Sequence, residues 1–277
     1  QSKHNTHQLL TKHIMRPGPG SLAQSSDQTE QYLKALKLQT FLREHDKVSR
    51  QCAAEGVGHP DFLLRLSELE LIDRHHHMMD RRIKAARFPT VKSLDSFDFL
   101  TFPSLNKPLV NELARSEHID RTDNVIAVGN SGAGKTHIAP GLGLAKCQKA
   151  LSVGFTTAAA LVHELTEARD EIRLLNMQKR LANLKLLIID ELGFVPLSKT
   201  GAELLFEVFG QRYERGSIMV PTNLPFDERT EVFASESLTG ALLYRLTHHA
   251  HILEMNGESY RLRQSRKTNK DQTEHEA

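Results

Sequence analysis

Residues 129–136 read Gly-Asn-Ser-Gly-Ala-Gly-Lys-Thr, and the rest of the chain is organised around this stretch. It matches the phosphate-binding pattern G-x-x-x-x-G-K-[ST] at every fixed position. Residues 124–128 before it are apolar and β-branched, as in a buried strand, and residues 136–150 after it can form a helix. Glycines let backbone N–H groups turn inward around phosphate oxygens, and the helix N-terminus adds partial positive charge. The stretch therefore predicts a phosphate-binding loop, against the alternative of a glycine-rich turn without that role.

The pattern assigns roles to two side chains. Lys135 is expected to reach the β- and γ-phosphates, and Thr136 to place its hydroxyl on Mg²⁺. A nucleoside triphosphate, ATP in this interpretation, is the expected ligand. The residues expected to surround it are Gly129, Asn130, Ser131, Gly132, Ala133, Gly134, Lys135, Thr136 and His137.

A second run, residues 186–191, is four aliphatic residues followed by two carboxylates. Such a run is typical of a central parallel strand, whose carboxyl end lies where ligands bind in open α/β sheets. Asp190 is therefore a candidate to hold Mg²⁺, and Glu191 to orient or deprotonate an attacking water. Alone, the acidic pair fits a solvated turn or a helix N-cap equally well. Behind a phosphate loop, it favours Mg²⁺-dependent hydrolysis of a nucleoside triphosphate.

Composition limits the alternatives. The 277 residues allow one α/β domain and a smaller appendage, and no apolar run is long enough for a transmembrane helix. The polar N-terminus lacks the apolar segment of a signal peptide, so a cytoplasmic protein is expected, with Cys52 and Cys147 as reduced thiols. A net charge of +2 means that nucleic-acid binding would need local basic patches. The absence of Trp makes aromatic base-stacking platforms unlikely to be the means of recognition.

Polarity and periodicity divide the chain into five segments. Residues 1–30 are expected to be a disordered leader, and 264–277 a polar tail. Residues 31–88 form a predicted N-terminal helical domain, with order beginning in a helix over 29–45 and a second helix over 61–87. Residues 89–120 are a predicted connector, whose aromatic part packs on the next domain. Residues 121–263 are the predicted α/β nucleotide-binding domain.

The second helix becomes basic after its middle. Five cations stand against the single anion Asp80, which suggests a surface for a DNA phosphate backbone, although a solvated helix face fits equally well. The cations are Arg74, Arg81, Arg82, Lys84 and Arg87. The triplet His75, His76 and His77 is not favoured as a metal site, because consecutive helical positions point to different sides.

Further elements complete the expected parallel sheet with right-handed crossovers. We predict helices over residues 105–118, 158–180, 201–215 and 238–248, strands over 152–156 and 217–222, and a strand or hairpin over 251–263. Asn223 follows one strand and could bind the γ-phosphate or the attacking water, or could simply form a turn. Arg245 could reach a neighbouring subunit's γ-phosphate or be an ordinary surface cation.

From about residue 32 to 266 the chain resembles the IstB-like ATP-binding proteins, AAA+ helper ATPases of bacterial insertion sequences that are related to DnaC-type helicase loaders. The matching stretches are residues 86–89, 97–99, 129–137, 155–159, 187–193, 201–206, 212–217, 222–226 and 257–261. The resemblance implies an AAA+ P-loop NTPase fold after the helical domain, with Asn223 as the sensor asparagine and Arg245 as the arginine finger. It also implies that the N-terminal helices help self-assembly, that the protein forms a homo-oligomer on double-stranded DNA with ATP at subunit interfaces, and that it delivers target DNA to a partner transposase.

Two prolines depart from the family pattern. Pro140 falls inside the helix after the phosphate loop, where an interior proline costs about 3 kcal/mol or causes a kink. Pro221 falls in a predicted central strand, where proline is rare. Three interpretations therefore stay open: a transposition ATPase, a DnaC-type replicative helicase loader, and a non-hydrolysing scaffold or inactive relic.

Overall fold

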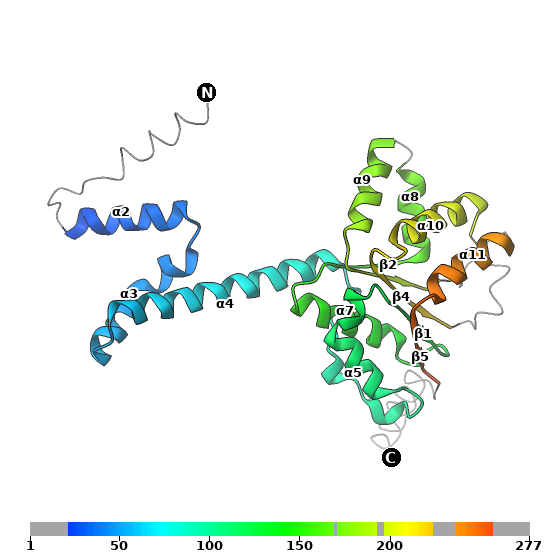
Figure 1. The fold of residues 1–277 in the computed structure, drawn as a ribbon, viewed down its shortest axis with the longest axis horizontal. Helices are drawn as coiled ribbons and strands as arrows, with labels where there is room; N and C mark the ends of the chain where they lie inside the picture. The colour runs from blue at the N-terminus through cyan, green and yellow to red at the C-terminus, as the bar shows by residue number, and fades with distance from the viewer. Residues whose placement is uncertain (1–21, 169–170, 193–196, 224–235, 257–277) are drawn as a thin grey trace, which may run out of the picture. The chain divides into compact units, whose positions relative to one another are not determined.

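The computed structural model describes residues 22–168, 171–192, 197–223 and 236–256 (Figure 1). It divides the chain into two compact units, residues 1–77 and 78–277, and each is described separately. Within the described ranges, none of the helices combines the length and apolar character needed to cross a membrane. Both cysteines are buried free thiols, as the sequence predicted.

The first unit is helical. It contains α2 (Leu22–Ala35), α3 (Gln39–Glu55) and the first part of α4 (His59–Ala86), with a small core of Val48, Cys52 and Leu66. Two expectations are corrected here. Helix α2 includes residues 22–30 of the segment expected to be a disordered leader, and the helix expected over 29–45 is two helices because Lys37 adopts a left-handed conformation (φ 58°).

A five-stranded sheet forms the centre of the second unit, in the order β2-β3-β4-β1-β5, and all neighbouring strands are parallel. The strands are β1 (Asn124–Val128), β2 (Val153–Thr157), β3 (Leu186–Asp190), β4 (Ser217–Thr222) and β5 (Ala250–Glu254). The predicted bounds of β1 and β4 are confirmed. β5 pairs in parallel with β1, and residues 260–263, the other arm of a possible hairpin, lie outside the described residues.

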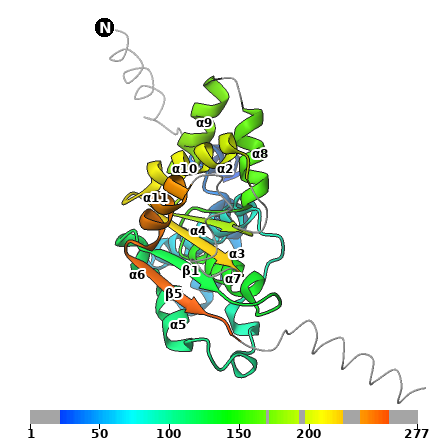
Figure 2. The same cartoon turned by 90° about the vertical axis from the view of Figure 1, so that its right-hand side faces the viewer.

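Helices cover both faces of the sheet (Figures 1 and 2). The helices are α5 (Lys107–Arg115), α6 (Glu117–Asp120), α7 (Lys135–Gln148), α8 (Ala158–Glu167), α9 (Glu171–Ala182), α10 (Lys199–Arg212) and α11 (Glu236–Thr247). One buried cluster joins α5 and α7 to the sheet, and another joins α8, α10 and α11 to its other face. The helix expected over 105–118 is interrupted at Ser116 (φ 76°), and the one expected over 158–180 is α8 and α9.

The connector belongs to the second unit. It contains two short 3₁₀ helices, η1 (Leu94–Ser96) and η2 (Phe99–Thr101), and buries Phe97 and Phe102 in the α7 cluster. A Cβ atom at Gly143 of α7 would lie 2.6 Å from the ring of Phe88. The absence of a side chain at this position therefore makes room for the aromatic connector, whose expected packing is confirmed.

Candidate nucleotide-binding site

The phosphate loop joins β1 to α7 and is held against two other strands. The Gly129 N–H donates to the Thr222 carbonyl oxygen at the end of β4 (3.1 Å). A Cβ atom at Gly129 would lie 2.1 Å from the Met255 carbonyl oxygen, so only glycine fits here without a backbone shift. Gly134 is the residue before α7 and has φ 84°, a conformation that glycine adopts at little cost. These contacts fix the loop at the carboxyl edge of the sheet.

Lys135 is the first residue of α7, and its ammonium group turns back over the loop. Its Nζ donates to the carbonyl oxygens of Gly129 and Asn130, the second at 2.8 Å. Thr136 follows and is exposed at the mouth of the loop. The loop therefore presents a cation and a hydroxyl to the same space.

The acidic pair lies at the end of β3. The Glu191 N–H donates to Asp190 Oδ1 (2.9 Å), and Glu191 has a left-handed backbone (φ 59°), which is uncommon for a residue other than glycine. Burial raises the pKa of the Asp190 carboxyl above its ordinary value. The Glu191 charge raises this pKa further, whereas the Glu191 N–H and Lys135 lower it. A half-buried carboxylate beside a second carboxylate gains stability from a cation, so Asp190 and the Thr136 hydroxyl fit the expected Mg²⁺ site.

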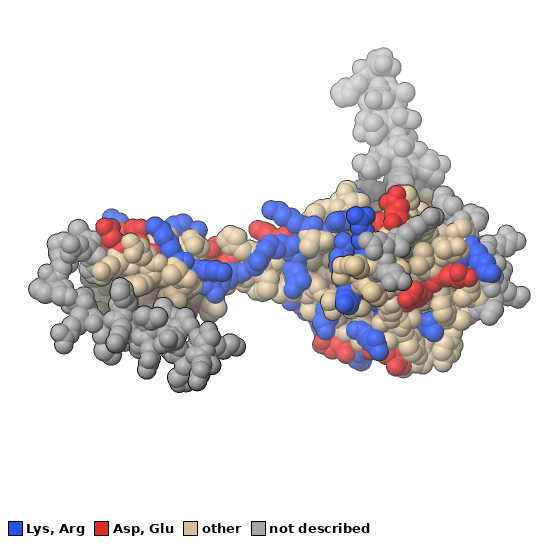
Figure 3. All heavy atoms as spheres, turned by 90° about the horizontal axis from the view of Figure 1, so that it is seen from above, with Lys and Arg blue, Asp and Glu red and all other residues tan. Residues whose placement is uncertain are grey.

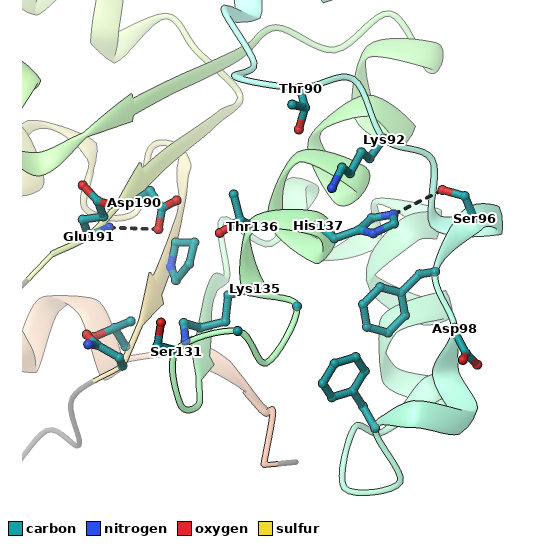
Figure 4. Close-up of a pocket in the computed structure, with 17 residues that line it drawn as sticks. Thr90, Lys92, Ser96, Asp98, Ser131, Lys135, Thr136, His137, Asp190 and Glu191 are labelled. Atoms are coloured by element: carbon teal, nitrogen blue, oxygen red, sulfur yellow. Dashed lines mark hydrogen bonds between the residues drawn. The ribbon is translucent and has the colours of Figure 1, made fainter. Parts of the chain in front are cut away.

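The order of the strands brings the predicted residues together. β4 lies between β1 and β3, so Asn223, directly after β4, lies between the phosphate loop and the acidic pair. Lys135, Thr136, Asp190, Glu191 and Asn223 all line one cavity of about 710 Å³ (Figure 4). Ser131, Gly132, Gly134 and His137 line it as well, whereas Gly129, Asn130 and Ala133 shape the loop without lining the cavity.

The connector supplies a wall of the cavity that motif matching missed. Its residues are Thr90, Lys92, Ser96, Phe97, Asp98 and Phe102. In Figure 4, Lys92, Ser96 and Asp98 lie on one side of the loop, and Asp190 and Glu191 lie on the other. No phosphate-binding motif includes these residues; the aromatic spacing of the connector and the family-matching stretch 97–99 were the available signals that it packs on this domain.

Arg245 lies away from this cavity. Its side chain extends from α11, and its guanidinium lies 4.2 Å from the centre of the Phe206 ring on α10. Its nearest guanidinium nitrogen would lie 2.8 Å from a Cβ atom at Gly210. Within one chain, the structure therefore does not bring Arg245 to the phosphate loop.

The basic residues expected on the second helix fall in both units, and the last of them, Arg87, lies directly after α4. In the first unit, Arg74 pairs with Glu70 (2.6 Å) and donates to the Lys37 carbonyl oxygen. The second unit contains the exposed cations Arg81, Arg82, Lys84 and Arg87. Basic side chains gather around this part of α4 on the face shown in Figure 3. Arg87 lies 3.8 Å from Glu164 of α8.

Comparison with known proteins agrees with this geometry. The family model for IstB-like ATP-binding proteins matches residues 31–268. The chain belongs to this family. It is 35% identical over 238 residues to a protein of insertion sequence IS21 from Pseudomonas aeruginosa whose name assigns it ATP binding, covering 86% of this chain and 90% of that protein. It is 32% identical over 240 residues to the corresponding protein of insertion sequence IS5376 from Geobacillus stearothermophilus, covering 87% and 96%.

Solved structures place this IstB-like protein in the AAA+ fold. DnaI superposes with a TM-score of 0.51 at 14% identity, covering 59% of this chain and 90% of that one. DnaA from Aquifex aeolicus, bound to AMPPCP, superposes with a TM-score of 0.52 at 17% identity, covering 61% of this chain and 51% of that one. At these identities the likeness concerns the fold alone.

Proposed function

We propose that this IstB-like protein is an Mg²⁺-dependent ATPase that assembles as a homo-oligomer on double-stranded DNA and assists a transposase in the transposition of an insertion sequence. The observation that carries the proposal is the single cavity shared by Lys135, Thr136, Asp190, Glu191 and Asn223. The transposition context is supported by relatives that are proteins of insertion sequences.

Five polar residues of the cavity have a chemical part in hydrolysis in this proposal. Lys135 pairs with the β- and γ-phosphates, and Asn223 donates its amide to the γ-phosphate or to the attacking water. Glu191 accepts a proton from that water as its oxygen attacks the γ-phosphorus, and the bond from that phosphorus to the β–γ bridging oxygen breaks. ADP, phosphate and one proton are released. Thr136 and Asp190 would hold Mg²⁺, which would neutralise part of the phosphate charge when bound.

Arg245 acts on the ATP of a neighbouring subunit in this proposal. Its distance from the cavity of its own chain supports a role between subunits, and an arginine supplied in trans stabilises the charge of the transition state. A mixing experiment tests this. Arg245→Ala subunits keep an intact cavity, and Lys135→Ala subunits keep an intact Arg245. Mixing two such inactive variants should restore part of the ATPase activity, and a mixture as inactive as its components would contradict the role in trans.

The decisive experiment measures ATP binding and hydrolysis by the purified protein, with and without duplex DNA. Turnover that depends on DNA and disappears in Glu191→Gln, while ATP binding remains, supports the proposal. Binding without turnover in the parent protein would leave the scaffold interpretation. A preference for single-stranded over duplex DNA would instead support a helicase-loader role.

DNA contact is assigned to the exposed cations of α4 in the second unit. Each phosphate contact makes the slope of log K against log salt more negative by about 0.9, where K is the DNA-binding constant. Replacing Arg81, Arg82 and Arg87 with Ala should weaken duplex binding and flatten that slope by about 2 to 3. Lys47 and Arg50, exposed on α3, provide a control pair whose replacement with Ala should leave the slope unchanged. An unaltered slope in the triple variant would return α4 to the solvated-face interpretation.

A further inference from the structure

His137 follows the Lys135-Thr136 pair, yet its imidazole turns away from the phosphate loop. Nε2 lies 3.0 Å from the Ser93 carbonyl oxygen and 3.2 Å from Ser96 Oγ. Figure 4 shows the ring directed at Ser96 of the connector. His137 was expected to surround the phosphates, but its side chain is engaged with the opposite wall of the cavity.

The hydrogen-bond chemistry shows which atom carries the proton. A carbonyl oxygen can only accept, so Nε2 must donate to Ser93. The Ser96 hydroxyl itself donates to the same carbonyl oxygen (2.7 Å), which leaves its lone pairs free to accept from Nε2. The imidazole N–H is therefore shared by the two ends of η1 and ties this short helix to the first turn of α7.

Aromatic packing ties the same wall to the loop at a second point. The Phe97 ring meets the His137 ring edge to face, with centroids 5.2 Å apart, and stacks on Phe102 at 5.4 Å. An atom of the Phe97 ring would lie 2.8 Å from a Cβ atom at Gly134. Phe97 and Phe102 are largely buried and also line the cavity, so these rings are part of the wall and pack it against the loop.

The wall faces the part of the cavity that the phosphates leave open. The loop binds phosphates, and the acidic pair marks the γ-phosphate end in the proposed function. The nucleoside must then extend to the other side of the loop, where Lys92, Ser96 and Asp98 lie (Figure 4). A residue that fixes η1 there should raise the affinity for the nucleoside, because a wall that is already held in place loses less conformational entropy when the nucleoside binds.

We propose that His137 is a positioning residue that holds the η1 wall for the nucleoside of the bound nucleotide, and that it is not a phosphate ligand. This inference rests on the proposed nucleotide site. Its signature is selective: loss of the Nε2 donor weakens binding of a nucleotide and leaves binding of the bare phosphate chain unchanged.

Calorimetry with ATP and with inorganic tripolyphosphate, both in the presence of Mg²⁺, tests this signature on the full chain. His137→Leu removes the donor and should weaken ATP binding about tenfold, the effect of losing one partly buried hydrogen bond, with tripolyphosphate affinity unchanged. His137→Gln keeps an N–H donor and should recover ATP affinity to within about threefold of the parent. Ser96→Ala, a change at an exposed residue, should weaken ATP binding only slightly because the Ser93 carbonyl remains.

Each contrary result is distinct. Equal losses for ATP and tripolyphosphate would show that His137 acts through the loop, and unchanged ATP affinity in His137→Leu would show that it does not hold the wall. Failure of His137→Gln to recover ATP affinity would exclude the N–H donor as the cause. A parent protein that binds neither ligand would overturn the nucleotide site itself, and this proposal with it.

Discussion

Lys146 offers a test of the core under the nucleotide site. It lies in α7 with no exposed surface, and its Nζ donates to the Leu113 carbonyl oxygen at the end of α5. Burial, and to a smaller extent the Lys149 charge, lowers its pKa from 10.5 to about 7. The Leu113 carbonyl also accepts from the Ser116 N–H (3.0 Å). Replacing Lys146 with Met should therefore remove a costly buried charge without leaving this carbonyl unpaired.

The sign of the pH effect follows from proton linkage. Between pH 7 and 10.5 the unfolded chain keeps a proton on Lys146 that the folded chain has lost, so the free energy of unfolding rises with pH. A difference of one bound proton changes the free energy of unfolding by about 1.4 kcal/mol per pH unit. Since Lys146 of the folded chain is still about half protonated at pH 7, the total change between pH 7 and 9 is about 2 kcal/mol. Burial raises the pKa of Cys147 to about 11, which lowers stability above pH 9. The window from pH 7 to 9 therefore isolates the lysine.

Urea unfolding followed by circular dichroism at pH 7 and pH 9 measures this effect. The parent protein should gain about 2 kcal/mol over the window, whereas Lys146→Met should gain almost none and should be more stable than the parent at pH 7 by about 1 to 4 kcal/mol. Lys149→Met, a control at an exposed position of the same segment, should keep most of the parent slope. A Lys146→Met variant that is less stable at pH 7, or that keeps the parent slope, would refute the argument that the buried charge is destabilising.

The remaining predictions concern the nucleotide site. Lys135→Ala should abolish ATP binding measured by calorimetry, because the phosphates lose their main cation; unchanged affinity would exclude the loop as the site. Glu191→Gln should bind ATP like the parent and release no phosphate, and full residual turnover would assign the water to another group. Gly129→Ala should weaken ATP binding at least tenfold because its Cβ meets backbone, whereas Gly240→Ala, whose Cβ meets open space on α11, should leave binding intact. Because burial raises the pKa of Asp190, this carboxyl becomes protonated at a higher pH than an ordinary aspartate does, and Mg²⁺ affinity should fall there as the solution is acidified. The Mg²⁺ dependence of turnover measures this affinity at each pH. A loss of affinity only below the ordinary aspartate pKa would contradict the burial effect.

The strands and the chemical residues of the site could be predicted because their signals are local. β1 and β4 are short, continuous apolar runs, and both are almost wholly buried in the centre of the sheet. The loop, the acidic pair and Asn223 each follow a strand, and the carboxyl ends of parallel strands share one edge. The alternation of strands and helices in the sequence is therefore sufficient to predict that these residues lie together.

The helix breaks and the cavity wall could not be predicted, because their causes are tertiary. Lys37 and Ser116 adopt left-handed conformations that sequence reasoning expects mainly at glycine. The connector residues that line the cavity match no nucleotide-binding pattern, and their position depends on Phe97 and Phe102 entering the core beside α7. The same packing directs His137 to the wall. Although His137 is adjacent to the phosphate motif, its side chain contacts the connector and not the loop.

The two prolines that were expected to disturb the site, Pro140 and Pro221, differ in what they affect. β4 pairs with β3 only from Ser217 to Met219, and the Thr222 carbonyl accepts from Gly129 on the β1 side. Since successive residues of a strand direct their backbone groups to opposite neighbours, Pro221 turns its nitrogen toward β3, just past Met219, the last residue of β4 that pairs with β3. Pro140 lacks the N–H that would bond to the Thr136 carbonyl, although α7 continues to Gln148. Pro221 therefore lies where the pairing of β4 with β3 ends, whereas Pro140 leaves the carbonyl of Thr136, a residue expected to hold the metal, without its helical hydrogen bond.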